Sequence, residues 1–205
     1  MDAQYGYEMW MQAITDAFCI HMQNQSGGAF MLRQSLTKLA WGFALIMVDI
    51  VINGFDLLPD IIGYILFVLA LGELERRSEC FDKARPLSIV LAVLSAFEIH
   101  RGLLVLIGPI KYLIALATIC LNLLVVYYIF MGMKEMCVMS GQRALAGESD
   151  QLWKYYMGLA LAGLAVFLLS GIPFFAFIGI VLVVANIVLL VFILRFLNSC
   201  GSLVR

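Results

Sequence analysis

The chain has 205 residues, of which 63% are hydrophobic and only 13% are charged, and its formal net charge is −1. Soluble domains are about 45–50% apolar and about 25% charged, so this chain has too little polar surface to coat a soluble globule. The small net charge also gives no electrostatic reason to expect nucleic acid as a partner. The composition therefore indicates an integral membrane protein whose first partner is the lipid bilayer.

Residues 1–30 form a polar N-terminal extension without lysine or arginine. Tyr7, Trp10 and Ile14 repeat at helical spacing, which favours an amphipathic helix, but membrane-surface helices normally carry basic residues on their polar face. The alternative is an over-extended gene start, with the native protein beginning at Met31. In either case we expect residues 31–205 to form the membrane domain.

Six apolar segments follow, and a helix needs about 20 residues to cross roughly 30 Å of hydrocarbon. The predicted spans are residues 39–55, 61–74, 87–99, 112–131, 155–169 and 176–196. Pro59, Pro109 and Pro173 each come just before the second helix of a pair, where the missing N–H of proline is tolerated. The pattern predicts an all-α bundle of six transmembrane helices in three consecutive hairpins.

The distribution of lysine and arginine predicts the orientation of the bundle. With six spans, eleven of the thirteen basic residues fall on one side, and Arg101 and Lys111 fall on the other. Cytoplasmic loops carry an excess of lysine and arginine, so we expect both termini to be cytoplasmic. Trp41, Trp153 and Tyr156 would then lie in an inner aromatic belt.

Asp49 lies near the middle of the first predicted span, where an ionised aspartate costs about 2.5–3.5 kcal/mol. An acid at that depth is by default a functional-site hypothesis. Asn53 and Asp56 follow at i+4 and i+7, so the three side chains would line one face of a helix. The later spans add further polar residues to this candidate pathway, namely Glu98, Asn122 and Asn186.

Two interpretations of these polar residues remain. In one, Asp49 carries a proton or a cation along the pathway. In the other, a protonated Asp49 is hydrogen-bonded to Asn122 or Asn186, because interhelical polar contacts are common in membranes and contribute about 0.6 kcal/mol each. We favour this structural interpretation for Asp49, and a surface ion pair at the membrane edge for Glu98.

The segment Met131-Gly-Met-Lys-Glu-Met-Cys-Val-Met139 is rich in sulfur. Thioether and thiolate ligands suit Cu(I), but a methionine-rich helix end also fills irregular space in a core. Because Lys134 and Glu135 interrupt the run and a second soft cluster is missing, we favour packing and expect no metal site and no cofactor. The five cysteines have no CxxC spacing, and we expect free thiols.

Small residues at intervals of four mark helix-packing faces. Ser88, Ala92 and Ala96 have this spacing on the third predicted span, and Gly158 and Ala162 have it on the fifth. Such patterns let two helices approach closely. The faces pack either within one chain or between chains, and the pattern is compatible with both.

The motifs of several enzyme classes are missing from the chain. It contains no HExxH sequence, no GxSxG elbow and no P-loop. An intramembrane aspartyl protease needs a second acid facing Asp49, and the later spans carry none in their core. The connector 73–86 mixes acids with bases and is expected to be solvated, and the loops are too short for a catalytic domain. We therefore expect that the chain is not an enzyme.

Two stretches resemble a segment that recurs in uncharacterised small multi-pass membrane proteins of bacteria. They are Asn53-Gly-Phe-Asp-Leu-Leu-Pro-Asp-Ile-Ile-Gly-Tyr-Ile-Leu66 and Phe81-Asp-Lys-Ala-Arg-Pro86. In that family a Leu-Pro-Asp-x-Ile-Gly-Tyr turn joins the first two helices. The resemblance covers residues 39–95, and it implies a bacterial cytoplasmic membrane and a similar fold, without an assigned activity. The turn motif that it singles out consists of Pro59, Asp60, Gly63 and Tyr64.

Two classes of function follow from these patterns. The favoured class is a non-enzymatic accessory, regulatory or assembly protein that acts through helix–helix contacts with other membrane proteins or with itself. The alternative is a small proton- or cation-coupled carrier or channel that uses Asp49. A water-filled cavity at Asp49 would favour the carrier, and a dry core with a lipid-exposed groove of small residues would favour the assembly role.

Overall fold

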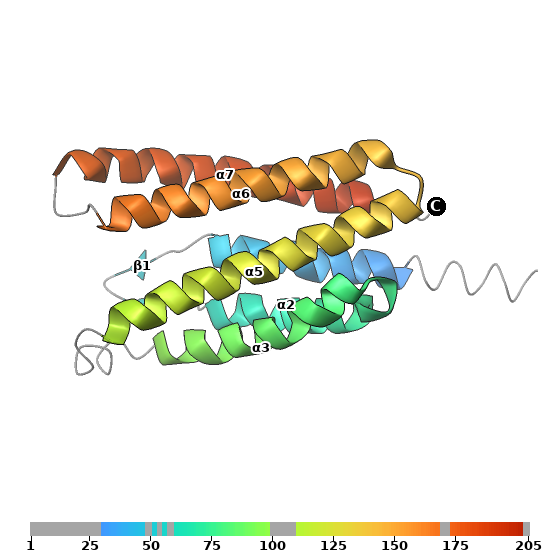
Figure 1. The fold of residues 1–205 in the computed structure, drawn as a ribbon, viewed down its shortest axis with the longest axis horizontal. Helices are drawn as coiled ribbons and strands as arrows, with labels where there is room; N and C mark the ends of the chain where they lie inside the picture. Colours follow the sequence, from blue (N-terminus) through green and yellow to red (C-terminus); the bar gives the residue numbers. More distant parts are fainter. Residues whose placement is uncertain are drawn as a thin grey trace, which may run out of the picture.

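The computed structural model describes residues 30–47, 51–52, 55–56, 60–98, 110–168 and 173–202, and within this part the fold is a bundle of six helices (Figure 1). The helices are residues 30–47, α2 (Asp60–Leu74), α3 (Glu79–Glu98), α5 (Ile110–Met139), α6 (Arg143–Leu168) and α7 (Pro173–Gly201). A 3-10 turn, η1 (Glu75–Arg77), joins α2 to α3. The prediction of an all-α fold with six helices is therefore confirmed.

The helices are longer than the predicted spans. α5 has 30 residues and α7 has 29, so at 1.5 Å per residue each is about 45 Å long, well beyond roughly 30 Å of hydrocarbon.

The expected solvated connector 73–86 is instead the end of α2, η1 and the first two turns of α3. Phe81 and Ala84 in this segment are fully buried, because their spacing of three places them on one helical face that packs into the core.

The region after the 30–47 helix also differs from the prediction of a helix over residues 39–55. Strand β1 (Val51–Ile52) pairs antiparallel with strand β2 (Phe55–Asp56). The sequence between the two strands is Asn53-Gly54, the dipeptide most favoured in two-residue hairpin loops, and β-branched residues precede it. Asp56 therefore does not continue a helical face from Asp49 and Asn53, which both lie outside the described residues.

α5 is the central helix of the bundle. It packs against α3 and α6, while α2 packs against α3 and α6 against α7. In Figure 1, α5 crosses the bundle obliquely between these two pairs. The ring of Phe130 on α5 contacts Phe43 of the 30–47 helix and Phe196 of α7, with centroid distances of 6.0 and 6.3 Å. One apolar core is thus shared by helices from both ends of the sequence.

The 30–47 helix and α2 approach most closely at Gly42 and Gly63. A Cβ atom at Gly42 would lie 2.5 Å from the ring of Phe67 and 3.1 Å from the carbonyl oxygen of Gly63. A Cβ atom at Gly63 would lie 2.6 Å from Ile46 and 3.1 Å from the carbonyl oxygen of Gly42. The contact is reciprocal, so glycine at both positions lets the two backbones meet.

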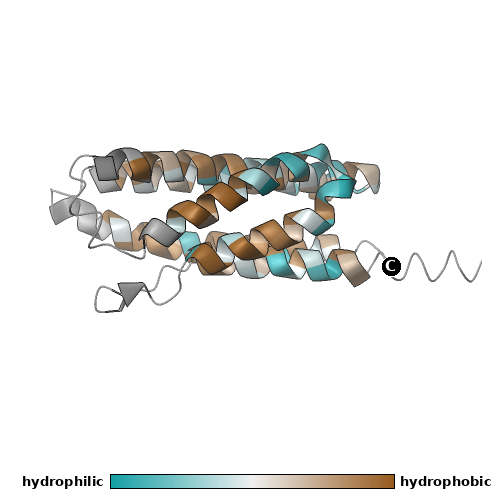
Figure 2. Cartoon of the chain, turned by 90° about the horizontal axis from the view of Figure 1, so that it is seen from below, coloured by the Kyte–Doolittle hydropathy of each residue, from teal (hydrophilic) through white to brown (hydrophobic). Residues whose placement is uncertain are grey.

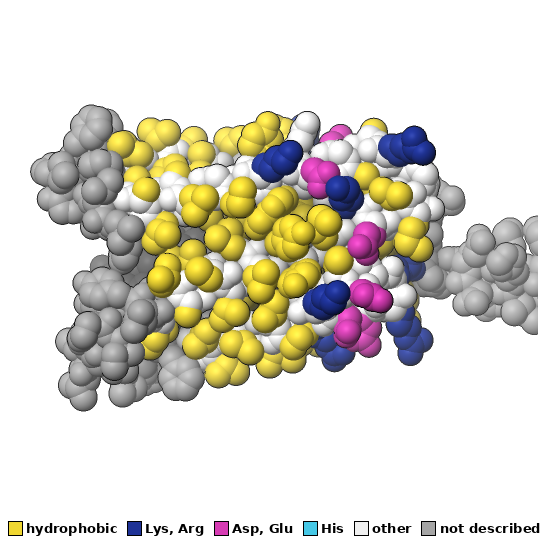
Figure 3. Space-filling model, in the orientation of Figure 1, with side chains coloured by type: hydrophobic (Ala, Val, Ile, Leu, Met, Phe, Trp, Pro, Cys, Tyr) yellow, Lys and Arg dark blue, Asp and Glu magenta, His cyan; other side chains and the backbone are white. Residues whose placement is uncertain are grey.

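Charged side chains gather toward one end of the visible face of the bundle, and hydrophobic side chains predominate over the middle of that face (Figure 3). Hydropathy coloured on the ribbon shows the same segregation from a second side (Figure 2). Gly201 of α7 lies against Arg33 and Leu36 of the 30–47 helix, so the first described helix begins where the last one ends. The charged side chains thus lie at the end of the bundle where the 30–47 helix begins and α7 ends.

Two described segments are long and apolar enough to cross a membrane, Leu116–Met139 in α5 and Ile178–Gly201 in α7. In the most apolar 18-residue stretch of each segment, only 33% and 28% of the residues are buried within the protein, whereas the core helix of a soluble protein is mostly buried. The other four described helices do not reach that length and hydropathy. The exposed large hydrophobic side chains of α7 are Ile180, Val181, Val183, Val184, Ile187, Val188, Val191 and Phe192.

Gly42→Ala is expected to destabilise the bundle by about 1–3 kcal/mol, the usual cost of overpacking a well-packed core. Phe67 is fully buried, so its ring can shift away from the new methyl group only by disturbing its neighbours in the core. Thermal unfolding of the detergent-solubilised protein measures the effect. Gly147→Ala on α6 is the matched control, because a Cβ atom there meets nothing within 4 Å, and the better helix propensity of alanine should leave it unchanged or more stable. Equal melting temperatures for both variants would contradict the close contact.

Candidate functional site

A groove of about 980 Å³ runs between α6 and α7. Small residues line it on both helices, Gly158 and Ala162 on α6 and Ala185 on α7. Gly158 and Ala162 lie four residues apart and so share one face of α6. A Cβ atom at Gly158 would meet no atom within 4 Å, so no described helix packs closely against this position.

The groove has a polar end as well as an apolar length. Lys154 and Glu148 of α6 and Arg195 of α7 line it together with apolar residues such as Val188 and Phe192. The polar residues come from the N-terminal turns of α6 and the C-terminal turns of α7, which belong to the charged end of the bundle. The groove is therefore suited to an elongated apolar ligand with a polar group at one end.

Asn122 and Tyr156 form a side-chain hydrogen bond inside the bundle that the sequence did not predict. Nδ2 of Asn122 on α5 donates a hydrogen bond of 2.9 Å to the Tyr156 hydroxyl on α6. Tyr156 was expected in an aromatic belt, but it is only 8% exposed, whereas its neighbour Tyr155 is 65% exposed. The correction follows from helical geometry, because adjacent residues point to different faces and a buried tyrosine hydroxyl needs a partner.

Two polar atoms close to this contact are left without a partner. The Oδ1 atom of Asn122 and the Oγ1 atom of Thr118 are buried, and neither makes a hydrogen bond to another described residue. The two residues lie one turn apart on α5 and so face the same side of the helix. A buried polar atom without a hydrogen bond costs about 1–3 kcal/mol. This side of α5 therefore carries two buried hydrogen-bonding atoms whose partners are missing among the described residues.

The remaining predicted pathway residues do not converge on this contact within the described part of the chain. Asn186 on α7 is half-buried and makes no hydrogen bond to a described residue. Glu98 is the last residue of α3, and its side chain, like that of Asp56, lies outside what is described. Asp49 and Asn53 are not described at all, so the expected bond from Asp49 to Asn122 or Asn186 stays a prediction.

The turn motif is described from Asp60 onward, since Pro59 lies outside the described residues. Asp60 is the first residue of α2, where an acid faces the positive end of the helix dipole. Gly63 packs against Gly42, and the ring of the buried Tyr64 packs nearly perpendicular to that of Phe67 at a centroid distance of 6.3 Å. These residues shape the contact between the first two helices.

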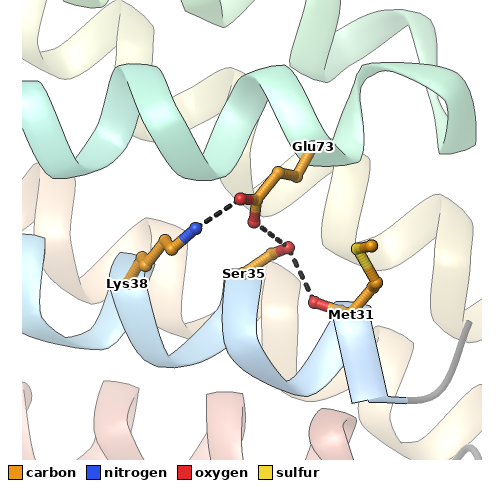
Figure 4. Close-up of polar contacts among 4 residues, drawn as sticks. All are labelled: Met31, Ser35, Lys38 and Glu73. Atoms are coloured by element: carbon orange, nitrogen blue, oxygen red, sulfur yellow. Dashed lines mark hydrogen bonds and ion pairs between the residues drawn. The ribbon is translucent and has the colours of Figure 1, made fainter. Parts of the chain in front are cut away.

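A carboxylate joins the same two helices at the charged end (Figure 4). Glu73 of α2 accepts a hydrogen bond from the Lys38 ammonium group, and Ser35 Oγ lies 2.6 Å from Glu73 Oε2 and 2.9 Å from the Met31 carbonyl oxygen. The single proton of Ser35 is shared between these two acceptors. Glu73 thus fixes the rotation of the 30–47 helix against α2.

Similar contacts recur between the other elements at this end. Glu135 of α5 accepts a hydrogen bond from the Ser78 hydroxyl. The Cys80 Sγ atom lies 3.6 Å from Oε1 of the same carboxylate. Burial raises the pKa of the Cys80 thiol, so this cysteine stays protonated near neutral pH. The ion pairs of the same kind are Arg85–Glu75 at 2.6 Å and Lys134–Asp150 at 2.7 Å.

The described residues contain no group of three or more His, Cys, Asp and Glu side chains that could hold a metal ion. The four described cysteines, Cys80, Cys120, Cys137 and Cys200, are free thiols. No protein-family model matches the chain, and no curated protein or solved structure gives a significant match. The resemblance to small bacterial membrane proteins therefore remains a prediction.

The Lys38–Glu73 contact is expected to contribute to stability, and a double-mutant cycle with Lys38→Met and Glu73→Gln measures it. We expect a coupling free energy near 1 kcal/mol, at the upper end for exposed pairs, because Ser35 also holds the carboxylate in place. The control cycle uses Lys83 and Glu79, whose side chains are 57% and 91% exposed, and should give close to zero. Equal coupling free energies in both cycles would show that the Ser35 contact does not strengthen the Lys38–Glu73 ion pair.

Proposed function

We propose that this chain is an integral membrane protein with six spanning helices, and that it acts as a non-enzymatic assembly or accessory protein. It would do so by binding an apolar helix of another membrane protein in the groove between α6 and α7. The observation that carries the proposal is the open face around Gly158, which the described helices leave uncovered. In this proposal the protein lies in a bacterial cytoplasmic membrane with both termini on the cytoplasmic side.

The outward-facing side chains support the membrane part of this proposal. Burying one large aliphatic side chain away from water stabilises a protein by about 1.5–3 kcal/mol, and α7 alone exposes eight large hydrophobic side chains. A water-soluble monomer rarely exposes so continuous an apolar surface. Helices also satisfy their own backbone hydrogen bonds, as the hydrocarbon region requires.

The groove supports a helix as the ligand because of its small residues. A Gly158/Ala162 face removes the side-chain volume that normally keeps two helix backbones apart, and lipid-embedded helices associate mainly through such close packing. At the polar end, Lys154 and Arg195 outnumber Glu148. The partner helix that fits best would therefore be apolar along its length and acidic where it leaves the membrane.

Gly158→Ile should abolish partner binding while leaving the bundle folded, since the space that the new side chain enters is empty. A photoreactive amino acid at Val188, on the opposite side of the groove, reports what lies there in native membranes. We expect one specific crosslinked protein in the parent chain and loss of that product in Gly158→Ile.

Gly163→Ile is the matched control. Gly163 is also on α6 and is equally open, but it does not line the groove, so the crosslink should persist in this variant. A crosslink between two copies of the chain would identify the partner as a second copy. Crosslinks to lipid alone would overturn the assembly proposal.

The second candidate function is a proton- or cation-coupled carrier that uses Asp49. The observation in its favour is the pair of unpartnered polar atoms on Thr118 and Asn122, which would suit a hydrated or ionic path through the bundle. The carrier stands second because the described core is otherwise apolar. Apart from Tyr156 and the buried polar atoms of Thr118 and Asn122, the buried polar side chains of the described core are all serines, namely Ser35, Ser78, Ser88, Ser95 and Ser149.

Thiol labelling at position 49 distinguishes the two functions. Asp49→Cys is introduced into a chain that lacks the five native cysteines, and intact cells are treated with a small charged thiol reagent. The assembly proposal predicts no labelling at position 49, whereas Ser140→Cys, at an exposed turn, should label from the cytoplasmic side in permeabilised cells. Rapid labelling at position 49 would show that water reaches this depth, and would favour the carrier.

A further inference from the structure

We propose that Cys137, Cys200 and Met133 form a binding site for a single Cu(I) ion at the charged end of the bundle. The packing of α7 against α5 brings Cys137 Sγ and Cys200 Sγ to 3.7 Å from each other, although the residues are 63 positions apart in the chain. Both cysteines are almost fully buried. The inference is independent of the groove between α6 and α7.

The distance between the two sulfur atoms suits a bridging metal ion. With metal–sulfur bonds of roughly 2.3 Å, as in zinc thiolates, one ion can bind both atoms with an angle of about 107° at the metal. The helices would not need to move. A disulfide bond, by contrast, needs the two sulfur atoms at about 2.05 Å, much closer than they are.

A third sulfur ligand comes from the same face of α5. Met133 lies one turn before Cys137, is fully buried, and lines the same cavity of about 300 Å³ as both cysteines. Two thiolates and a thioether are soft ligands that favour Cu(I) over harder ions. Zinc usually takes four cysteine, histidine or carboxylate ligands, which the described residues do not supply here.

The surroundings of the cavity also fit a bound monovalent ion. Two thiolates with one Cu(I) ion carry a net charge of −1, and Arg76 and Arg77 line the same cavity and can offset it. Met136 is half-buried and Met139 is exposed, and both line the cavity as well. They form a series of soft ligands from the aqueous surface to the buried pair, which gives the ion a path into the site.

In this proposal the methionine-rich segment contributes ligands for Cu(I), whereas its sequence favoured a role in packing. The absence of a second soft cluster argued for simple packing of Met131–Met139. Cys200 is that missing soft ligand, and only the packing of α7 against α5 places it beside Cys137.

Titration of the reduced, full-length protein in detergent with Cu(I), in competition with a chromophoric Cu(I) chelator, tests the proposal. We expect one Cu(I) ion per chain, with X-ray absorption showing sulfur ligands only. Cys137→Ser and Cys200→Ser should each abolish binding. Met133→Leu, a volume-conserving change that keeps both thiols, should weaken binding by more than the roughly tenfold effect of losing an outer-shell partner.

Cys120→Ser is the matched control, since Cys120 lies on the same helix but is exposed and far along α5 from the cavity. It should bind Cu(I) like the parent chain. Retention of the ion by the Cys137→Ser, Cys200→Ser double variant would overturn the proposal, and so would absence of binding to the reduced parent chain. If a cysteine variant does not fold, unchanged affinity in Met133→Leu would overturn the three-sulfur site.

Discussion

The close contact between Gly42 and Gly63 is the constraint on which the rest of the bundle depends. Because Gly42 has no side chain, the ring of Phe67 fits against the 30–47 helix and reaches Phe43 at a centroid distance of 4.9 Å. Phe43 contacts Phe130 of α5, which contacts Phe196 of α7. A row of aromatic rings thus runs from α2 to α7, and a side chain at position 42 would displace its first member.

The polar contacts of the charged end act on the same helices from outside the apolar layer. Glu73, Glu75, Glu135 and Asp150 each contact a neighbouring element through a serine, arginine or lysine. Contacts of this kind contribute little individually when exposed, but they restrict how each helix rotates about its axis. Rotation decides which residues face outward, and therefore whether α6 presents Gly158 to the groove or to another helix.

The groove and the sulfur cavity suggest two distinct binding functions in one helical bundle, for a partner helix and for Cu(I). The groove lies on the outer surface of α6 and α7, where a membrane partner can reach it, whereas the sulfur cavity lies among α5, α7, η1 and the start of the 30–47 helix. α7 takes part in both. An ion that ties Cys200 to α5 would hold the end of α7 in place, close to Arg195 and Ser199 at the polar end of the groove.

The sequence by itself determined the class of fold, because too few polar residues and six apolar segments leave little choice but an apolar helical bundle. It also indicated the small-residue face of α6. The helix ends, the inward direction of Tyr156 and the meeting of Cys137 with Cys200 were decided by tertiary structure. Periodicity reports which residues share a face, but which face meets which helix depends on packing between segments far apart in the chain.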